Sequence, residues 1–334
     1  MAITAKELAE KLNISAAAVS MALNDKPGVS TKTRKMVKLA AEKYGYDFSR
    51  INAKAKKGGT IYFINYRKSG AIVSDTPFFS EMTDGIKEAC GQAGYKLRVI
   101  SLYEADLAEE DLTRLVPAEC DGILLLGTEM MSDDIKPFQG LSVPLVVLDS
   151  YFETFACDTI LINNEQGAYQ AARHLIRKRK TQPGYLMSSV RINNFQSRAD
   201  GFYKAVRASG MSSTQCIVHE LTPSYSGAYA DMKQILERKE PLADCYFADN
   251  DLIAAGAVRA FKEAGMRIPE DVAVVGFDNM PVAQVLDPAL TTINVPKKYI
   301  GQQAVLRLVQ RIASPDMPVI KEEIATTLID RYSC

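Results

Sequence analysis

Short apolar runs alternate with longer periodic stretches from residue 59 to the end of the chain. Apolar runs bounded by turn residues are typical of buried parallel strands, and apolar residues that recur every three or four positions are typical of the helices that cover them. Strands are expected at 61–64, 97–100, 122–126 and 145–148 and, in a second set, at 159–162, 185–187, 217–221, 245–248 and 273–277; helices are expected at 79–93 and 106–115, then at 166–177, 198–208, 227–238 and 253–264.

Because strands and helices alternate in two sets, the sequence predicts an α/β region of two doubly wound parallel-sheet lobes. The chain is expected to cross between the lobes near 149–158 and again around 279–295. The whole region is expected to form a domain of residues 60–334. Its N-lobe is expected to comprise about 60–150 and 280–293, and its C-lobe about 159–278 and 294–330.

Residues 1–47 have a different pattern, with three short helical periods that each follow a polar capping residue. Thr4 and Glu7 form a capping box, while Ser15 and Ser30 are placed to cap the second and third helices. A helix, a tight turn, a short helix, a turn and a helix make up an N-terminal all-α helix-turn-helix domain, although a purely structural mini-domain is the alternative. The inward positions are Val19 and Leu23 in the second helix and Val37, Ala40, Ala41 and Tyr44 in the third.

Charge is distributed unevenly between these two regions. Residues 1–60 contain twelve Lys and Arg against five Asp and Glu, a net charge of +7. The whole chain has 40 basic and 40 acidic residues, so the remainder contains 28 basic and 35 acidic residues, a net charge of −7. A short basic module joined to a larger acidic one is typical of a protein that meets phosphate at one end only. A solvated lysine-rich helix face is the alternative interpretation.

Several classes of function are disfavoured. The six cysteines are scattered without a C-x-x-C pair and the chain has two histidines, so we expect no structural metal, no cofactor and a reduced, cytoplasmic setting. No signal peptide opens the chain, and no apolar run approaches the roughly 20 residues that span a bilayer. Nucleotide-binding glycine motifs and a G-x-S-x-G elbow are missing, and His174 and His219 are far apart in the sequence, so an enzyme is not expected.

The N-terminal motif resembles the headpiece of LacI/GalR-type repressors. The resemblance rests on the run from Val19 to Ser30, on Thr33-Arg34 and on Tyr44-Gly45-Tyr46, and it continues through nearly the whole chain. It implies that Ala16, Ala17 and Met21 read bases. The other DNA-binding residues that it implies, chiefly for backbone phosphates, are Thr4, Ser15, Ser20, Asn24, Ser30 and Thr33.

Two positions depart from the pattern of that family. Met21 stands where arginine is common, and neither it nor the alanines can form a bidentate bond to a base, so apolar contacts and DNA shape are expected to carry specificity. Residues 48–59 are expected to form a hinge linker, in which Ala55 replaces the leucine that wedges into the minor groove. With Lys54, Lys56 and Lys57 around it, we predict weaker kinking and a steep salt dependence of DNA affinity.

Polar residues follow several of the predicted strands, where open α/β sheets bind ligands. Asp149, Asn250, Asp251 and Asp278 are of this kind, although each could instead cap a helix. Residues 249–257 and 272–279 resemble the effector domain of the same family, which is similar to periplasmic sugar-binding proteins. The resemblance implies that Asn194, Arg198, Asn250 and Asp278 hold polar groups of an effector, that Phe79 and Tyr225 form aromatic walls and that Asp149 lines the cleft, although Phe78 or Phe79 could instead belong to the core.

These features together predict a sequence-specific transcriptional regulator, more specifically a repressor, in which residues 60–334 bind the effector and form a dimer. Its expected partners are double-stranded DNA with a palindromic operator, a small-molecule effector and a second copy of the chain. A sugar is the leading candidate for the effector, with a nucleoside or a phosphorylated metabolite behind it. The alternative is a soluble small-molecule-binding protein or an α/β enzyme without an operator-specific role.

Overall fold

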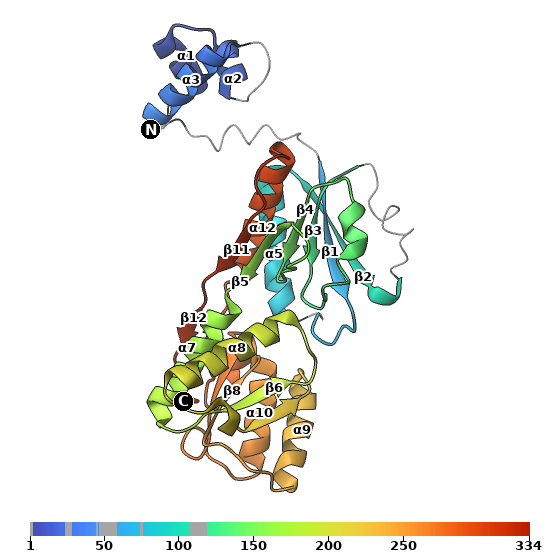
Figure 1. Ribbon diagram of the computed structural model, residues 1–334, viewed down its shortest axis with the longest axis vertical. Helices are drawn as coiled ribbons and strands as arrows, with labels where there is room; N and C mark the ends of the chain where they lie inside the picture. Colours follow the sequence, from blue (N-terminus) through green and yellow to red (C-terminus); the bar gives the residue numbers. More distant parts are fainter. Residues whose placement is uncertain (1–2, 24–28, 45, 47–58, 74–75, 107–118) are drawn as a thin grey trace. The chain divides into compact units, whose positions relative to one another are not determined.

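The computed structural model describes residues 3–23, 29–44, 46, 59–73, 76–106 and 119–334 (Figure 1). The chain separates into a unit of residues 1–58 and a unit of residues 59–334. Each unit has its own hydrophobic core. Within the described ranges, no helix is both long and apolar enough to span a bilayer.

The N-terminal unit contains α1 (Ala5–Leu12), α2 (Ala16–Leu23) and α3 (Thr31–Lys43). All three predicted caps are confirmed. Thr4 and Glu7 form a reciprocal capping box, in which the Glu7 carboxylate accepts from the Thr4 amide at 2.7 Å. The Ser15 hydroxyl accepts from the Ala18 amide and the Ser30 hydroxyl accepts from the Thr33 amide, each at 3.1 Å. These bonds satisfy amides that would otherwise lack a partner in the first helical turn.

The core of this unit differs from the prediction at Tyr44. Leu8, Val19 and Val37 are fully buried between the three helices, as the periodicity indicates. Tyr44, predicted on the inner face of α3, is instead 40% exposed. It follows the last residue of the helix, and its ring lies under the ammonium groups of Lys11 and Lys43 at 5.0 and 5.7 Å. Cations over an aromatic face are favourable at a wet surface, so this ring stays outside the core.

The N-lobe of the second unit is built on a six-stranded sheet in which every pair of neighbouring strands is parallel. Helices α5 (Pro77–Ala93) and α12 (Lys297–Ala313) pack together, and α12 lies against the central strands. The opposite face packs against Phe138 of η2 (Lys136–Gly140). The strands, in spatial order, are β11 (Lys321–Ile324), β5 (Asp158–Ile162), β4 (Leu145–Leu148), β3 (Cys120–Leu126), β1 (Thr60–Arg67) and β2 (Lys96–Tyr103), and η1 (Glu104–Asp106) follows β2.

The C-lobe holds a second six-stranded sheet with helices on both faces (Figure 1). All its neighbouring strands are parallel except β12, which pairs antiparallel with β10. The strands, in spatial order, are β12 (Thr327–Ile329), β10 (Thr291–Asn294), β9 (Ala273–Asp278), β8 (Cys245–Ala248), β6 (Gly184–Ser188) and β7 (Val218–Leu221); the helices are α7 (Asn164–Arg179), α8 (Asn193–Ala208), η3 (Ser213–Gln215), α9 (Tyr225–Glu237), α10 (Asp251–Glu263) and α11 (Pro281–Val285).

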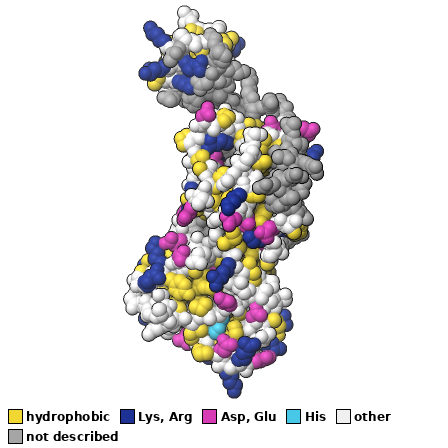
Figure 2. All heavy atoms as spheres, turned by 45° about the vertical axis from the view of Figure 1, so that its right-hand side comes forward, with side chains coloured by type: hydrophobic (Ala, Val, Ile, Leu, Met, Phe, Trp, Pro, Cys, Tyr) yellow, Lys and Arg dark blue, Asp and Glu magenta, His cyan; other side chains and the backbone are white. Residues whose placement is uncertain are grey.

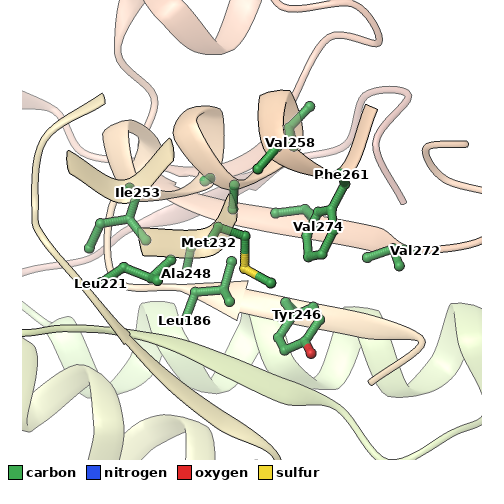
Figure 3. Packing of buried hydrophobic residues seen from close by; sticks show 14 of the residues in the cluster. Leu186, Leu221, Met232, Tyr246, Ala248, Ile253, Val258, Phe261, Val272 and Val274 are labelled. Carbon is green, nitrogen blue, oxygen red and sulfur yellow. The ribbon is translucent and has the colours of Figure 1, made fainter. Parts of the chain in front are cut away.

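The two faces of the C-lobe sheet have separate cores, because successive strand residues point to opposite sides. Figure 3 shows one core, where Leu186 and Val274 of the strands lie beneath Ile253 and Phe261 of α10. On the other face an aromatic cluster forms. Tyr185 lies 4.9 Å from Phe202 of α8 and 5.3 Å from Phe247 of β8, measured between ring centroids.

The chain divides between the lobes differently from the predicted ranges, and those ranges are wrong in three places. Strand β5 belongs to the N-lobe sheet, β10 belongs to the C-lobe sheet, and α12 with β11 returns to the N-lobe. The chain therefore crosses after β5, after β10 and between β11 and β12. The alternation of strands and helices could not reveal this, because an apolar run does not indicate which sheet it joins. Tertiary contacts fix the assignment: the Asp158 carboxylate of β5 binds Arg307 and Arg311 of α12 at 2.6 and 2.8 Å.

Candidate DNA-binding surface and effector cleft

The predicted base-reading residues lie on the outer side of α2. Ala16 and Ala17 are exposed and Met21 is half-buried. The small side chains leave the first turn of α2 open to a close approach, and the start of a helix carries partial positive charge that favours phosphate. Figure 2 shows Lys and Arg side chains, in dark blue, on the surface of this unit.

The remaining predicted DNA-binding residues of this unit surround the helix ends. Thr4, Ser15 and Ser30 are exposed, and Ser20 and Thr33 are half-buried. The hydroxyls of Ser30 and Thr33 are hydrogen-bonded to each other at 2.8 Å, which leaves one of their two protons for an outside acceptor such as a phosphate. The other predicted positions, Asn24, Lys54, Ala55 and Lys56, lie outside the described residues, as does the hinge linker except for Gly59.

A cleft lies at the carboxyl ends of both sheets, where the lobes meet. Six of the seven predicted effector-binding residues line it. The open space in the cleft is about 60 Å³, which is less than the several hundred Å³ of a typical ligand pocket. Its walls are therefore nearly closed on one another. The predicted residues that line it are Phe79, Asp149, Asn194, Arg198, Asn250 and Asp278.

Tyr225, predicted as an aromatic wall, does not line this cleft. It is the first residue of α9, after the cap Ser224, and is 38% exposed. Pro223 and Phe195 lie at the cleft instead. Neither residue could be predicted for the cleft from the sequence, because their positions depend on how α8 and the loop before α9 pack.

Arg198 is the centre of the polar network at the base of the cleft. Its Nε donates to Asn164 Oδ1 at 2.9 Å, its Nη1 to the carbonyl of Asp249, and its Nη2 to Asp278 Oδ1 at 3.2 Å. The guanidinium also lies 3.8 Å from the ring centroid of Phe277. Neither Asn164 nor Phe277 could be predicted for this site from the sequence, because each meets Arg198 only through contacts between distant elements.

A chain of amide hydrogen bonds joins the two lobes across the cleft. Asn164 Nδ2 donates to Asn194 Oδ1 at 3.2 Å, and Asn194 Nδ2 donates to the carbonyl of Asp149 at 3.1 Å. Asn194 comes from α8 of the C-lobe, whereas Asp149 follows β4 of the N-lobe. Thr128 holds the Asp149 carboxylate at 2.7 Å. The position of one lobe is thus linked to the polar groups of the other.

Buried carboxyl groups outnumber cations in this region. Burial, with a smaller contribution from the nearby charge of Asp278, raises the pKa of Asp149 and of Asp249 to about 6, against the opposing effect of hydrogen bonds and Arg198. Burial and Asp278 together raise the pKa of Asp251 to about 8. Burial also raises the pKa of Asp278 itself, against the opposing charge of Arg198. Carboxyl groups clustered in a dry site resist full ionisation together.

Asn250 and Phe78 each combine a structural role with a place in the cleft. Asn250 caps α10, since its Oδ1 accepts from the Ile253 amide at 2.8 Å, and it also lines the cleft. Phe78 and Phe79 form an edge-to-face pair with centroids 5.0 Å apart, and both line the cleft. Phe78 is the more buried of the two, at 7% exposed. Capping and core packing therefore coexist with cleft positions.

Comparison with known proteins gives a consistent result. Residues 67–333 match the family of periplasmic binding proteins and the sugar-binding domain of the LacI family. The chain is 30% identical to the HTH-type transcriptional repressor PurR of Pectobacterium carotovorum subsp. carotovorum (strain PC1), over 99% of this chain and 96% of that protein.

Solved structures show the same relationship. The regulator CelR in complex with cellobiose is 25% identical, with a TM-score of 0.73 over 99% of this chain and 100% of that one. A LacI-family regulator from Enterococcus faecalis V583 with bound ribose is 28% identical, with a TM-score of 0.68 over 82% of this chain and 98% of that one. The lac repressor dimer bound to operator, 22% identical with a TM-score of 0.72 over 100% of this chain and 99% of that one, shares the fold. The chain belongs to the LacI family and is a DNA-binding transcriptional regulator under the control of a small-molecule effector, not an enzyme.

Proposed function

We propose that the cleft binds an uncharged ring compound rich in hydroxyl groups, with a sugar as the leading class. Binding changes the angle between the lobes and thereby the affinity of two paired headpieces for a palindromic operator. The observation that supports this most directly is the network from Arg198 through Asn164 and Asn194 to the Asp149 carbonyl, which reaches from one lobe to the other. A ligand that replaces any of these bonds must affect how the lobes meet.

The charges at the cleft favour an uncharged effector. Arg198 is the one cationic side chain among the described residues that line the cleft, and it is already paired with Asp278. A phosphate would have to compete for that guanidinium while facing the carboxyl groups of Asp149 and Asp278. Hydroxyls can donate to carboxylates and accept from guanidinium N–H groups, so they satisfy both kinds of neighbour. A sugar therefore fits these charges better than a phosphorylated metabolite does.

The aromatic residues of the cleft favour a ring. Phe79 from the N-lobe and Phe195 from the C-lobe both line it, and aromatic faces suit the apolar face of a sugar or a flat nucleobase. CelR with cellobiose and two Enterococcus regulators with ribose are similar proteins whose structures hold sugars. These similarities support a sugar over a nucleoside.

The small open space of the cleft supports coupling between binding and lobe movement. About 60 Å³ does not hold a sugar ring, so an effector enters only when the lobes separate. The effector then shifts DNA affinity by as much as its own affinity differs between the two lobe arrangements. Repression is the proposed outcome, since curated relatives are repressors.

A homodimer with two headpieces fits the surface of the second unit. Val285, at 81% exposed, and Tyr332, at 75%, are large apolar side chains open to solvent on the C-lobe. Leu306 and Tyr299 of α12 are 51% and 47% exposed on the N-lobe. Apolar side chains of this size commonly become buried in subunit interfaces. In such a dimer, two headpieces read the two half-sites of a palindromic operator. We place this activity in the cytoplasm, where DNA is accessible.

A thermal-shift screen tests the cleft. Sugars, their phosphates and nucleosides are compared on the full-length protein and on the Arg198→Ala and Asp278→Ala variants, with Arg207→Ala on the exposed side of the same helix as a matched control. We expect an uncharged sugar to stabilise the unmodified protein and the control but neither cleft variant. Ligand stabilisation that survives both cleft substitutions would refute the site, and a preference for a nucleoside or a phosphate would refute the proposed class.

Titration with fluorescent DNA tests the operator function. Random duplexes are compared with a palindrome selected from a random pool. The proposed regulator prefers the palindrome and responds to the effector found in the screen. A binding protein or enzyme without an operator role shows equal, weak affinity for both.

A further inference from the structure

A buried carboxylate outside the polar network described above lies in the turn after β3. Glu129 is 3% exposed, and its two oxygens accept five backbone N–H groups at distances between 2.7 and 2.9 Å. One oxygen, Oε2, accepts three of them and Oε1 accepts two. The donors are the amides of Lys68, Ser69 and Gly70 to Oε2, and of Ile72 and Val73 to Oε1.

These five bonds explain how a charge is tolerated there. Burial by itself would raise the pKa of Glu129, but the hydrogen bonds from the loop outweigh it and hold the pKa of this carboxyl below its usual range. The loop wraps the anion as a nest of successive amides. Gly70 takes the left-handed conformation within it, at a φ of 72°. The remaining amide of the segment, that of Ala71, donates to the Ser69 hydroxyl at 3.2 Å.

The wrapped segment is also a wall of the cleft. Ala71 and Ile72 line it, and neither side chain has a polar group that could fix its own position. Thr128, the neighbour of Glu129, holds the Asp149 carboxylate at 2.7 Å. Two adjacent residues of one turn therefore organise two separate parts of the N-lobe side of the cleft.

We propose that Glu129 is a positioning residue that fixes the segment 68–73 as the N-lobe wall of the effector cleft. The proposal rests on the proposed function of that cleft. Glu129 is absent from the cleft lining, so it acts through the loop and not by touching the effector. Its side chain also supplies all the acceptors for five amides that no strand or helix satisfies, which a neutral side chain of the same shape cannot do.

Hydrogen–deuterium exchange on the ligand-free, full-length protein tests the anchoring. In Glu129→Gln the NH₂ group that replaces one oxygen faces N–H donors, so the amides of residues 68–73 exchange at least about tenfold faster. Exchange in β3 and β4 stays within about twofold. Asp133→Asn, a change of an 83% exposed carboxylate in the same loop, is the matched control and leaves the segment unchanged. Unchanged exchange at 68–73 in Glu129→Gln, or faster exchange across the whole lobe, overturns the proposal.

A second pair of variants approaches the nest from the loop and covers the case in which Glu129→Gln does not fold. Gly70→Ala forces a side chain into the left-handed region without a steric clash, since no atom lies within 4 Å of the added Cβ. Gly94→Ala imposes the same strain at a φ of 80°, again with nothing within 4 Å, at the end of α5. Faster exchange at 68–73 in Gly70→Ala but not in Gly94→Ala supports the proposal. Equal exchange at 68–73 in both contradicts it.

Ribose and cellobiose titrations then separate positioning from general stability. For whichever probe binds, its Kd rises at least about fivefold in Glu129→Gln and Gly70→Ala, while the Tm without ligand falls no further than it does in Gly94→Ala. An unchanged Kd in the presence of accelerated loop exchange overturns the role in the cleft. If neither probe binds the unmodified protein, the sugar assignment fails, and the exchange data alone decide whether Glu129 anchors the wall.

Discussion

Arg198 donates through Nη2 to the carboxylate of Asp278 at 3.2 Å, and neither side chain is more than 10% exposed. The pair is asymmetric, because Arg198 also holds Asn164 and the Asp249 carbonyl, whereas Asp278 shares its surroundings with Asp149 and Asp251. Removing the Arg198 cation takes away the positive charge that offsets these buried carboxyl groups. Removing the Asp278 carboxylate instead relieves repulsion among the remaining carboxyl groups.

We therefore expect substitution of Arg198 to lower the free energy of unfolding more than substitution of Asp278 does. Arg198→Met should lower the free energy of unfolding by about 3 kcal/mol or more, since it strands a buried charge. Asp278→Asn keeps an acceptor for Nη2 and should cost about 1 kcal/mol. Urea denaturation of the ligand-free protein measures both, and equal losses would contradict the asymmetry.

Asp251 predicts a pH dependence of stability. Its pKa is about 8 in the folded protein, against an ordinary value near 3.8, so the folded state holds a proton that the unfolded state has lost between these two values. The contribution of Asp251 to the free energy of unfolding is therefore largest below about pH 4, declines as the pH rises to about 8, and is constant above that. Asp251→Asn removes this decline. Between pH 6 and 8, the free energy of unfolding of the unmodified protein should therefore fall by up to about 1 kcal/mol per pH unit relative to that of the variant.

The control for this experiment is an exposed carboxyl. Asp287 is 95% exposed, so Asp287→Asn should leave the pH profile of unfolding parallel to that of the unmodified protein. Chemical denaturation at pH 6, 7 and 8 provides the comparison. Parallel profiles for Asp251→Asn as well would show that this carboxyl is ionised in the folded state at neutral pH.

The sequence predicted the parts of the site that depend on local order. Asp149, Asn250 and Asp278 were found because each follows an apolar run, and the carboxyl ends of parallel strands gather at one edge of a sheet. Asn194 and Arg198 needed the family resemblance, since nothing in the helical period marks them. All of these line one cleft.

What the sequence could not predict depends on contacts between elements distant in the chain. Glu129 meets amides some 60 positions earlier, and Asn164 meets Arg198 34 positions later. The same holds for the lobes, where β5 looks like the first strand of the second set yet pairs with β4. Tyr225, which the resemblance implied as an aromatic wall, lies at the start of α9 and does not line the cleft, a position that depends on how the loop before α9 packs.

Met21 predicts apolar readout by the headpiece. It lies half-buried on the outer side of α2 and carries no group that can bond to a base edge. Met21→Ala should weaken binding to the selected operator about five- to tenfold, leave binding to random DNA unchanged and leave the slope of log K against log salt unchanged. Fluorescence anisotropy at several salt concentrations measures all three.

The same substitution on a different helix is the control. Met36 is 41% exposed on α3, and Met36→Ala should leave operator affinity within about twofold. If Met21→Ala changed the salt slope or weakened random and selected DNA equally, this side chain would not be reading sequence.

The crossing of α5 and α12 gives a prediction that contrasts two glycines. A Cβ at Gly301 of α12 would collide with the backbone carbonyl of Met82 on α5, whereas a Cβ at Gly91 of α5 meets nothing within 4 Å. Gly301→Ala must therefore separate two helices that pack closely, and should lower the free energy of unfolding by about 1–3 kcal/mol. Gly91→Ala only removes backbone freedom in an exposed helical turn, and should raise it by about 0.5 kcal/mol. Thermal and urea unfolding of both variants measure this sign difference. Because α12 also holds Asp158 of β5 through Arg307, a destabilised crossing should loosen this part of the N-lobe sheet first, as faster amide exchange in β5. A stabilising Gly301→Ala would show that the two helices can separate without cost.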